Sequence, residues 1–322
     1  MRSTDFLNTE AETKLREDLI AAGAACSLWT NSEDLLQATR ETFLNLAPPH
    51  GPVDFSMRLW VDDKEQSQPP WPAPYVRGLS HLVFASFDEG STLLADLRRR
   101  HVIGRLSRGM AADHSYCMAV LFPMLLTIVS ASVGIAELHC ACVAKGDRAL
   151  LLAGPSGSGK STLSLALSQQ GFGFISDDRS FCSLGPHAVQ VWGLPTRLKL
   201  RPEAASWFPE LRAMRVSTSA KGTPELWIEP ERLKGIKRVQ QSRPTWLIFL
   251  EQRDSTEFKL SRVSSEEALR RLEPDLTAEL PDATARRTET LQRIVQLPCW
   301  LLRYGGDPQL VAQRISGHIA PS

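Results

Sequence analysis

The chain has 322 residues, of which 43% are hydrophobic and 23% are charged, and its formal net charge is +1. This composition predicts a soluble globular protein with one large domain or two ordinary ones, and the charge excludes a global electrostatic attraction to nucleic acid or membranes. The six cysteines form no C-x-x-C pair, and together with the polar N-terminus they indicate a cytoplasmic protein with buried, reduced thiols.

The first 108 residues predict a small α+β lobe without a recognisable chemical motif. Residues 1–20 predict a polar, partly helical lead-in, and Ser32 is typical of the N-cap of a helix over Glu33–Leu46. Strands are expected over Val53–Val61, Leu79–Phe87 and Leu93–Leu106. The last of these has an alternative, a break at the arginine run, which itself favours a solvated face over an anion site.

No charged residue occurs between Tyr116 and Ala136. This length would suit a membrane span, and the arginines from Arg98 to Arg108 would suit a positive-inside anchor. The stretch also contains a proline and several small polar residues, and it leads almost directly into the next predicted strand. A buried helix within residues 109–136, linking two domains, is the simpler prediction, with the membrane span as its alternative.

The residues after this stretch predict a hairpin that leads into a glycine-rich loop and a helix. The hairpin strands are expected over His139–Ala144 and Ala149–Ala153. Gly154–Ser161 then reads G-x-x-x-x-G-K-S, the phosphate-binding loop, and the helix over Ser161–Gln170 is closed by Gly171. A strand before the motif and a helix after it are the context that the motif requires. A chance glycine-rich turn is the alternative.

Nucleotide chemistry explains the residue types of this loop. Its glycines allow the backbone N–H groups to point at phosphate oxygens, and the helix N-terminus adds its positive dipole. Lys160 would reach the β- and γ-phosphates, and Ser161 offers a hydroxyl to Mg²⁺. ATP and Mg²⁺ are therefore the expected cofactors. The predicted nucleotide-binding residues are Gly154, Pro155, Ser156, Gly157, Ser158, Gly159, Lys160, Ser161 and Thr162.

Two adjacent carboxylates, Asp177 and Asp178, follow a short apolar strand over Phe172–Ser176. In a parallel α/β sheet that end of the strand faces the ligand crevice. Because adjacent carboxylates repel each other, we expect one to hold Mg²⁺ and the other to have a raised pKa and act as a base. The alternative is a single metal-holding aspartate with a solvated neighbour.

The rest of the chain completes an α/β domain over residues 137–322. Arg197, Lys199 and Arg201 alternate and predict a cationic wall beside the phosphates, or else exposed charges on an edge strand. Arg212–Pro224, which includes Lys221, predicts a mobile loop that contacts substrate. The remaining expected elements are strands over Ser180–Leu184, Ala188–Trp192, Trp246–Glu251 and Cys299–Tyr304, and helices over Ser265–Leu272, Ala283–Leu297 and Pro308–His318.

Several motifs together resemble the HPr serine kinase/phosphorylase family, and more closely its shorter HPr-kinase-related proteins. They are His139 in LHCACV, the loop GPSGSGKST and the segment GFGFISDD, all within residues 137–180. The resemblance implies a P-loop kinase domain of the HPr kinase/PEP carboxykinase-like fold, preceded by the smaller α+β lobe.

The same resemblance implies roles for individual residues. Asp178 matches the family's proton acceptor, Asp177 would hold Mg²⁺ or orient the site, and His139 matches an active-site histidine. Lys160 and Ser161 match the residues that contact phosphate and Mg²⁺. Glu203 lies where the family has a Mg²⁺-ligating glutamate, although its neighbours do not match the family's segment.

The chain lacks L-E-I-R-G-x-G and V-R-P-G-R-N-like segments, and the second serves phosphorolysis in the complete enzyme. The resemblance therefore implies a kinase without phosphorylase activity, which acts on a serine of a small protein or peptide and forms a homo-oligomer. A kinase acting on free serine or a sugar, and a nucleotide-binding regulatory protein without phosphotransfer, are the alternatives.

Overall fold

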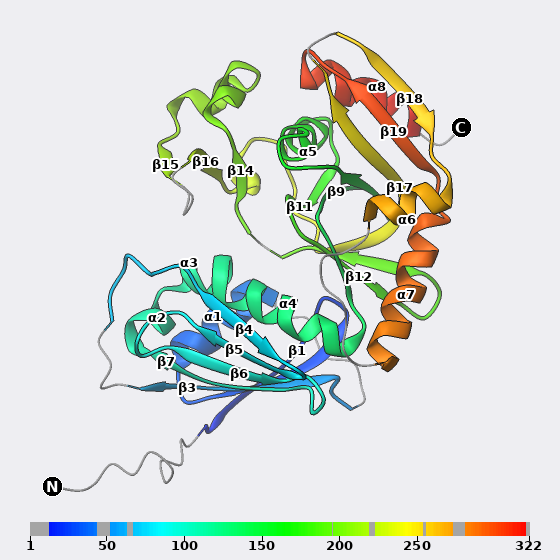
Figure 1. Cartoon of the computed structure of the whole chain (residues 1–322). Helices are drawn as coiled ribbons and strands as arrows, with labels where there is room; N and C mark the ends of the chain where they lie inside the picture. Colours follow the sequence, from blue (N-terminus) through cyan, green and yellow to red (C-terminus); the bar gives the residue numbers. More distant parts are fainter. Residues whose placement is uncertain are drawn as a thin grey trace, which may run out of the picture. The chain divides into compact units, whose positions relative to one another are not determined.

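The computed structural model describes residues 13–43, 52–62, 67–194, 196–218, 223–253, 256–272 and 281–319. The chain divides into two compact units, Met1–Val133 and Gly134–Ser322 (Figure 1). Both units combine mixed sheets with helices, so the α/β prediction is correct at that level.

The first unit is built on a seven-stranded mixed sheet in the order β1-β2-β3-β7-β6-β5-β4. Its strands are β1 (Leu15–Ala21), β2 (Ala24–Thr30), β3 (Phe55–Asp62), β4 (Tyr75–Leu79), β5 (Leu82–Ser86), β6 (Thr92–Asp96) and β7 (His101–Ser107). The pairs β2–β3 and β3–β7 are parallel, and the other pairs are antiparallel. The half-buried strand predicted over Val53–Val61 is confirmed, with alternate residues buried along β3.

One expectation for this unit was wrong, and one alternative is confirmed. Residues 15–20 form a strand, not part of a helical lead-in, because Ala22 and Gly23 take positive φ and turn the chain back into β2. For Leu93–Leu106 the alternative is confirmed, because the chain breaks at the arginine run and forms a hairpin of β6 and β7. Residues 1–12 of the predicted lead-in lie outside the described residues.

The helices of the first unit are α1 (Glu33–Phe43), α2 (Arg108–Ala112), α3 (His114–Tyr116), the π-helical turn η1 (Cys117–Leu121) and α4 (Phe122–Val133). The Ser32 hydroxyl accepts a hydrogen bond from the Leu35 backbone N–H at 3.3 Å, as its predicted capping role requires. The uncharged stretch thus forms a short helix, a π turn and a twelve-residue helix. No helix in the described part of the chain is both long and apolar enough to span a membrane.

The second unit contains a nine-stranded mixed sheet, and Figure 1 shows its strands together with α5 and α7. Its strands are β8 (Ala136–Leu138), β9 (Cys140–Lys145), β10 (Arg148–Ala153), β11 (Gly173–Ser176), β12 (Ser180–Leu184), β13 (Val189–Trp192), β17 (Gln241–Gln252), β18 (Phe258–Arg262) and β19 (Cys299–Tyr304). Only β10–β17 and β17–β19 pair in parallel within this described sheet. The predicted hairpin into the loop is confirmed as β9 and β10.

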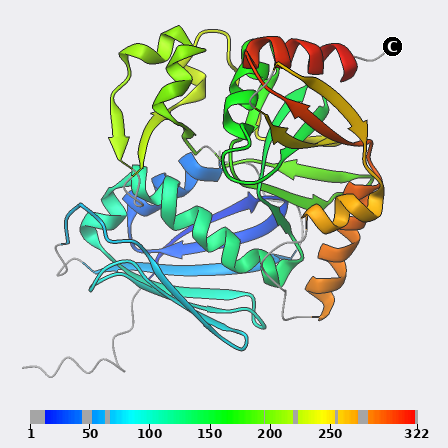
Figure 2. The same ribbon diagram turned by 45° about the horizontal axis from the view of Figure 1, so that its top comes forward.

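Helices cover both faces of this sheet (Figure 2). They are α5 (Lys160–Gln169), α6 (Ser265–Leu272), α7 (Pro281–Val295) and α8 (Pro308–Ile319). Leu150 and Leu152 of β10 belong to a core shared with α5 and α8, whereas Leu151 between them belongs to a core shared with α6 and α7. Successive residues of a strand point to opposite faces, so an apolar run such as Leu150–Ala153 fits a strand buried on both sides.

A small three-stranded sheet lies beside α5 in the second unit. Its strands are β14 (Leu198–Leu200), β15 (Val216–Thr218) and β16 (Pro224–Ile228), and the short 3-10 helices η2 (Pro202–Ser206), η3 (Pro209–Ala213) and η4 (Pro230–Arg232) accompany them. The predicted mobile loop over Arg212–Pro224 is partly a strand, and Lys221 lies outside the described residues.

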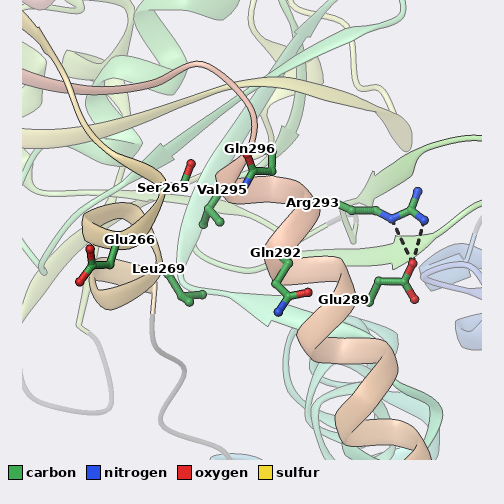
Figure 3. A pocket seen from close by; sticks show the side chains of 8 residues that line it. All are labelled: Ser265, Glu266, Leu269, Glu289, Gln292, Arg293, Val295 and Gln296. Carbon is green, nitrogen blue, oxygen red and sulfur yellow. Dashed lines mark hydrogen bonds and ion pairs between the residues drawn. The ribbon is translucent and has the colours of Figure 1, made fainter.

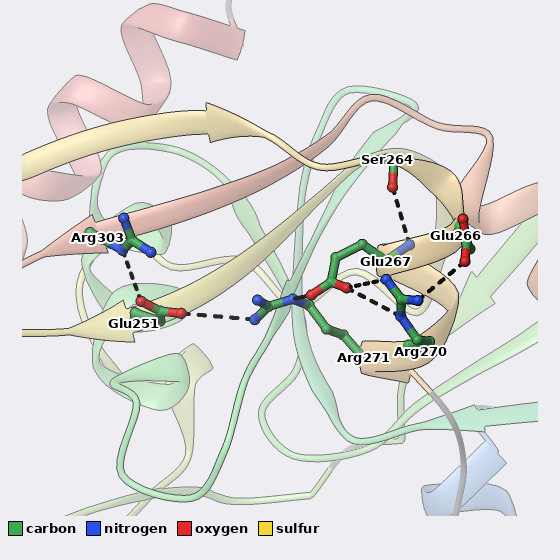
Figure 4. A network of polar contacts seen from close by, with 7 residues as sticks. All are labelled: Glu251, Ser264, Glu266, Glu267, Arg270, Arg271 and Arg303. Atoms are coloured by element: carbon green, nitrogen blue, oxygen red, sulfur yellow. Dashed lines mark hydrogen bonds and ion pairs between the residues drawn. The ribbon is translucent and has the colours of Figure 1, made fainter.

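Polar contacts tie α6 to the edge of the large sheet (Figure 4). The Arg303 and Arg253 guanidinium groups donate to Glu251 at 3.0 and 2.9 Å, and Arg271 of α6 joins at 3.9 Å. The hydrogen bond from Arg303 is the largest cause that holds the pKa of the Glu251 carboxyl below its ordinary value. This network lies at the ends of β17 and β19 and has a structural role.

All six cysteines are buried and free, as the sequence predicts. Burial raises the pKa of the Cys140 thiol to about 12, so this residue behaves as an apolar core group.

Candidate functional site

The glycine-rich loop lies between the end of β10 and the start of α5, in the predicted strand–loop–helix order. Gly157 and Gly159 have φ values of 84° and 87°, in the left-handed region that favours glycine. Gly159 is the N-cap of α5, so the first N–H groups of that helix have no partner within it. The loop therefore presents amide donors and a helix dipole at one place, which suits an anion.

Tyr304, at the end of β19, contacts the backbone of this loop. Its hydroxyl donates a 2.7 Å hydrogen bond to the Ser158 backbone carbonyl, and a Cβ at Gly159 would collide with the same hydroxyl. Glycine is thus required at residue 159 for space as well as for φ. Sequence reasoning missed Tyr304 because the two partners lie 146 residues apart and no local pattern connects them.

Lys160 is folded back over the loop and is only 7% exposed. Its ammonium donates to the carbonyl oxygens of Gly154 and Pro155 at 2.7 and 3.2 Å, and its Nζ lies 3.2 Å from His139 Nε2. Burial lowers the pKa of Lys160, while the charges of Asp178 and Asp177 act in the opposite direction. The ammonium thus stands at the centre of the loop, where a phosphate group would meet it.

His139 connects Lys160 to Asp178. Because an ammonium can only donate, Nε2 of His139 accepts, and Nδ1 must then carry the ring hydrogen. That Nδ1 lies 3.1 Å from the Asp178 carboxylate, which accepts its hydrogen bond. The His139 and Asp178 side chains remain 58% and 62% exposed. The three predicted residues thus form one chain of contacts that opens to solvent.

Asp177 has the opposite environment, with only 5% of the residue exposed. Its Oδ2 accepts a 3.0 Å hydrogen bond from the Lys199 backbone N–H, whereas its buried Oδ1 has no hydrogen-bond partner among the described residues. Burial raises the pKa of Asp177 to about 6, and the Lys199 N–H and the Ser161 side chain act against this shift. Asp177, which is expected to hold Mg²⁺, therefore has a raised pKa. The sequence predicted the raised pKa at the base instead.

The unpaired oxygen of Asp177 fits a cation. A buried carboxylate oxygen without a donor is costly unless a charge or a proton satisfies it, and a hydroxyl with a carboxylate is a ligand pair that Mg²⁺ accepts. Asp177 and Ser161 would supply that pair. No group of three or more His, Cys, Asp or Glu side chains within the described ranges could hold a metal ion, so the remaining ligands would have to come from phosphate or water.

The aspartate pair reaches the loop by a different route from the one expected. The neighbour of β11 is β9, and these strands are antiparallel, so this part of the sheet is not parallel as predicted. However, β9 is also antiparallel to β10, and β11 therefore runs in the same direction as β10. The carboxyl ends of β10 and β11 meet at one edge, which brings Asp177 and Asp178 to the loop.

The cationic wall beside the phosphates stays a prediction, and its alternative describes Lys199, which is exposed on the edge strand β14. Arg197 pairs with Glu229 at 3.7 Å, and the Lys199 ammonium lies 5.7 Å from the centroid of the Trp227 ring. The Arg201 guanidinium lies next to the loop, because a Cβ added at Gly157 would be 3.8 Å from it. Glu203 is exposed on η2, and its predicted role as a ligand stays a prediction.

The cavity drawn in Figure 3 lies elsewhere, between α6 and α7. It is lined by the ends of these helices, with Leu269 on one side and the Arg293–Glu289 ion pair on the other. It shares no lining residue with the loop, His139 or the aspartates.

Comparisons with known proteins find similarity among solved structures, and that similarity is distant. No protein-family model matches the chain, and no curated protein matches it. Among solved structures it is similar to the Hpr(Ser) kinase/phosphatase from Coxiella burnetii, with 14% sequence identity and a TM-score of 0.31. The match covers 56% of this chain and 95% of that chain. The expected resemblance to HPr kinases is thus supported only as a distant structural similarity, and we assign no residue a role from it.

Proposed function

We propose that this protein is an ATP- and Mg²⁺-dependent kinase that phosphorylates a serine hydroxyl of a protein or peptide. The observation that carries the proposal is the chain of contacts from Lys160 through His139 to Asp178, next to a glycine-rich helix N-terminus. It combines an anion site with a solvent-accessible carboxylate, and phosphoryl transfer to an alcohol requires both.

In the proposed reaction, the serine oxygen bonds to the γ-phosphorus while the bond from that phosphorus to the β–γ bridging oxygen breaks. The hydroxyl proton passes to the Asp178 carboxylate oxygen that His139 does not engage, and ADP leaves. Lys160 exchanges its contacts with the Gly154 and Pro155 carbonyls for phosphate oxygens. His139 is a positioning residue, which keeps the carboxylate in one orientation.

A bound Mg²⁺ would neutralise charge on the phosphates, and Asp177 with Ser161 would hold it. Ionisation of Asp177 then becomes favourable, because the cation satisfies the buried oxygen. Asp177 therefore has a role distinct from that of Asp178.

The exposure of Asp178 and His139 favours a large acceptor. A kinase for free serine or a sugar must surround its substrate to orient it, and enclosure would bury these side chains. Both are more than half exposed, and a serine on a flexible segment of another protein could reach them.

The test is transfer from γ-labelled ATP with Mg²⁺ to a library of serine-containing peptides, and separately to free serine and to sugars. We expect phosphoserine in peptides and an equal amount of ADP. Asp178→Asn should slow transfer roughly 10²–10⁴-fold, as loss of a general base does, while ATP affinity is kept.

The matched control is Asp147→Asn, since Asp147 is an exposed aspartate in the turn between β9 and β10. It should leave transfer unchanged. If Asp178→Asn transferred phosphate at the wild-type rate, the assignment of the base would be wrong. ATP binding without any phosphorylated product would instead favour a regulatory protein.

A further inference from the structure

The seven-stranded sheet of the first unit has an edge strand, β4, whose side chains are all exposed. Strand β4 is the last in its sheet, and within the described residues it pairs only with β5. All five of its residues are exposed, including Tyr75 at 61% and Leu79 at 76%. A free edge with large apolar side chains is a template for another strand. Folded proteins usually protect such edges, so its exposure here needs an explanation.

The hairpin geometry shows which backbone groups of β4 face outward. Ser80 and His81 form a two-residue loop between the paired residues Leu79 and Leu82. In such a hairpin the flanking pair exchanges hydrogen bonds, and bonded and non-bonded pairs then alternate along the ladder. The N–H and C=O groups of Val76 and Gly78 therefore point away from β5, towards the free edge.

The side chains of β4 set a pattern for an incoming strand. Tyr75, Arg77 and Leu79 share one face, which gives the order apolar, cationic, apolar. Arg77 forms no ion pair within the described part of the chain. On the opposite face, a Cβ at Gly78 would have no atom within 4 Å, so a partner could approach closely there.

Charge decides between a second copy of this chain and a different partner. Antiparallel pairing of two β4 strands about a central two-fold axis would place Arg77 opposite Arg77, at a non-hydrogen-bonded position where side chains are closest. The neighbouring β6–β7 turn adds Arg98, whereas Arg99 in the same turn pairs with Asp96 at 3.7 Å. A like-charged strand is therefore disfavoured, and an acidic one is favoured.

We propose that β4 binds an extended acidic segment of a partner protein by antiparallel strand addition, with an acidic residue opposite Arg77 and apolar residues opposite Tyr75 and Leu79. The backbone groups of Val76 and Gly78 supply the hydrogen bonds, and the side chains of the β4 face supply the selection. The proposal is independent of phosphoryl transfer.

The test uses the full chain and a fluorescein-labelled peptide, Thr-Phe-Thr-Glu-Thr-Leu-Thr, with a lysine version of the same peptide as a comparison. By fluorescence anisotropy, the glutamate peptide should bind about threefold to tenfold more tightly than the lysine peptide. In Arg77→Glu this preference should invert. Arg58→Glu is the matched control, because Arg58 lies in the same cross-strand row but on β3, inside the sheet.

The backbone contribution is tested at Gly78. Gly78→Pro removes one outward N–H and should weaken binding about threefold to tenfold, whereas Gly78→Ala keeps the N–H and should bind like the wild type. Bound glutamate peptide should slow hydrogen exchange at the amides of Val76 and Gly78. Circular dichroism melts confirm that each variant is folded.

Three results would overturn the proposal. They are no binding of the glutamate peptide, a preference that Arg77→Glu does not invert, and equal binding by Gly78→Pro and Gly78→Ala. A concentration-dependent dimer in sedimentation velocity that Gly78→Pro dissociates would also overturn it, since a second copy would then occupy β4.

Discussion

The two large sheets of this protein use their surfaces in opposite ways. The nine-stranded sheet is covered on both faces, and its polar side chains gather at the edge where β10 and β11 end. The seven-stranded sheet leaves apolar residues such as Phe84 and Leu94 exposed, at 44% and 36%. A sheet covered on both faces leaves its strand ends for polar side chains, whereas an open sheet face offers a surface for contact.

The strongest test of this contrast is a pair of substitutions, one in each unit. Lys160→Ala should lower phosphoryl transfer at least about 10³-fold, because it removes the only side-chain cation that the loop itself carries. Phe84→Ser should leave transfer to a short peptide unchanged, since Phe84 lies on the open face of the other unit. Initial rates with labelled ATP measure both.

Equal losses of transfer rate in the two variants would contradict the proposal that only the second unit carries out phosphoryl transfer. Thermal melts serve as the control, because Lys160→Ala also leaves the Gly154 and Pro155 carbonyls without their donor.

A second test uses the buried carboxylate. The pKa of Asp177 is raised from 3.8 to about 6 by burial, so the folded state binds this proton more tightly than the unfolded chain. This contribution to stability is complete below pH 4 and is lost as the pH rises through 6. At pH 7.5 without metal, Asp177→Asn should therefore be more stable than the wild type, by at most about 3 kcal/mol.

Urea denaturation from pH 4 to 7.5 measures this difference, which should vanish near pH 4. An Asn variant that is less stable than the wild type at pH 7.5 would show that the ionised carboxylate is well accommodated. Added Mg²⁺ and ATP should stabilise the wild type but not the variant, because Asp177 is the proposed ligand.

The smallest expected effect concerns Arg201, which directly follows β14 and lies next to the loop at Gly157. Arg201→Ala should raise the KM for ATP about tenfold, as loss of a charged hydrogen bond to phosphate does, with little change in melting temperature. Arg197→Ala is the control, because Glu229 already pairs with that guanidinium. Steady-state kinetics measure both, and equal KM values would remove Arg201 from the site.

Local patterns predicted much of the second unit. Apolar runs, glycines and a lysine within one short stretch predicted the β9–β10 hairpin, the loop and α5. A separate apolar run predicted β19. The turn at Ala22 and Gly23 was missed because alanine-rich strands carry a weak strand signal. The Lys199 N–H that holds Asp177 was also missed, since a backbone donor can belong to any residue type.

The bond between Tyr304 and Ser158 also sets an order of events during synthesis. Ser158 and Tyr304 are separated by 146 residues, so the ribosome makes the glycine-rich loop long before it makes the tyrosine that hydrogen-bonds to it. A nascent chain that has not yet reached β19 lacks this hydrogen bond. This hydrogen bond can therefore form only after Tyr304 has been made, when the strands and helices that precede β19 are already available to fold.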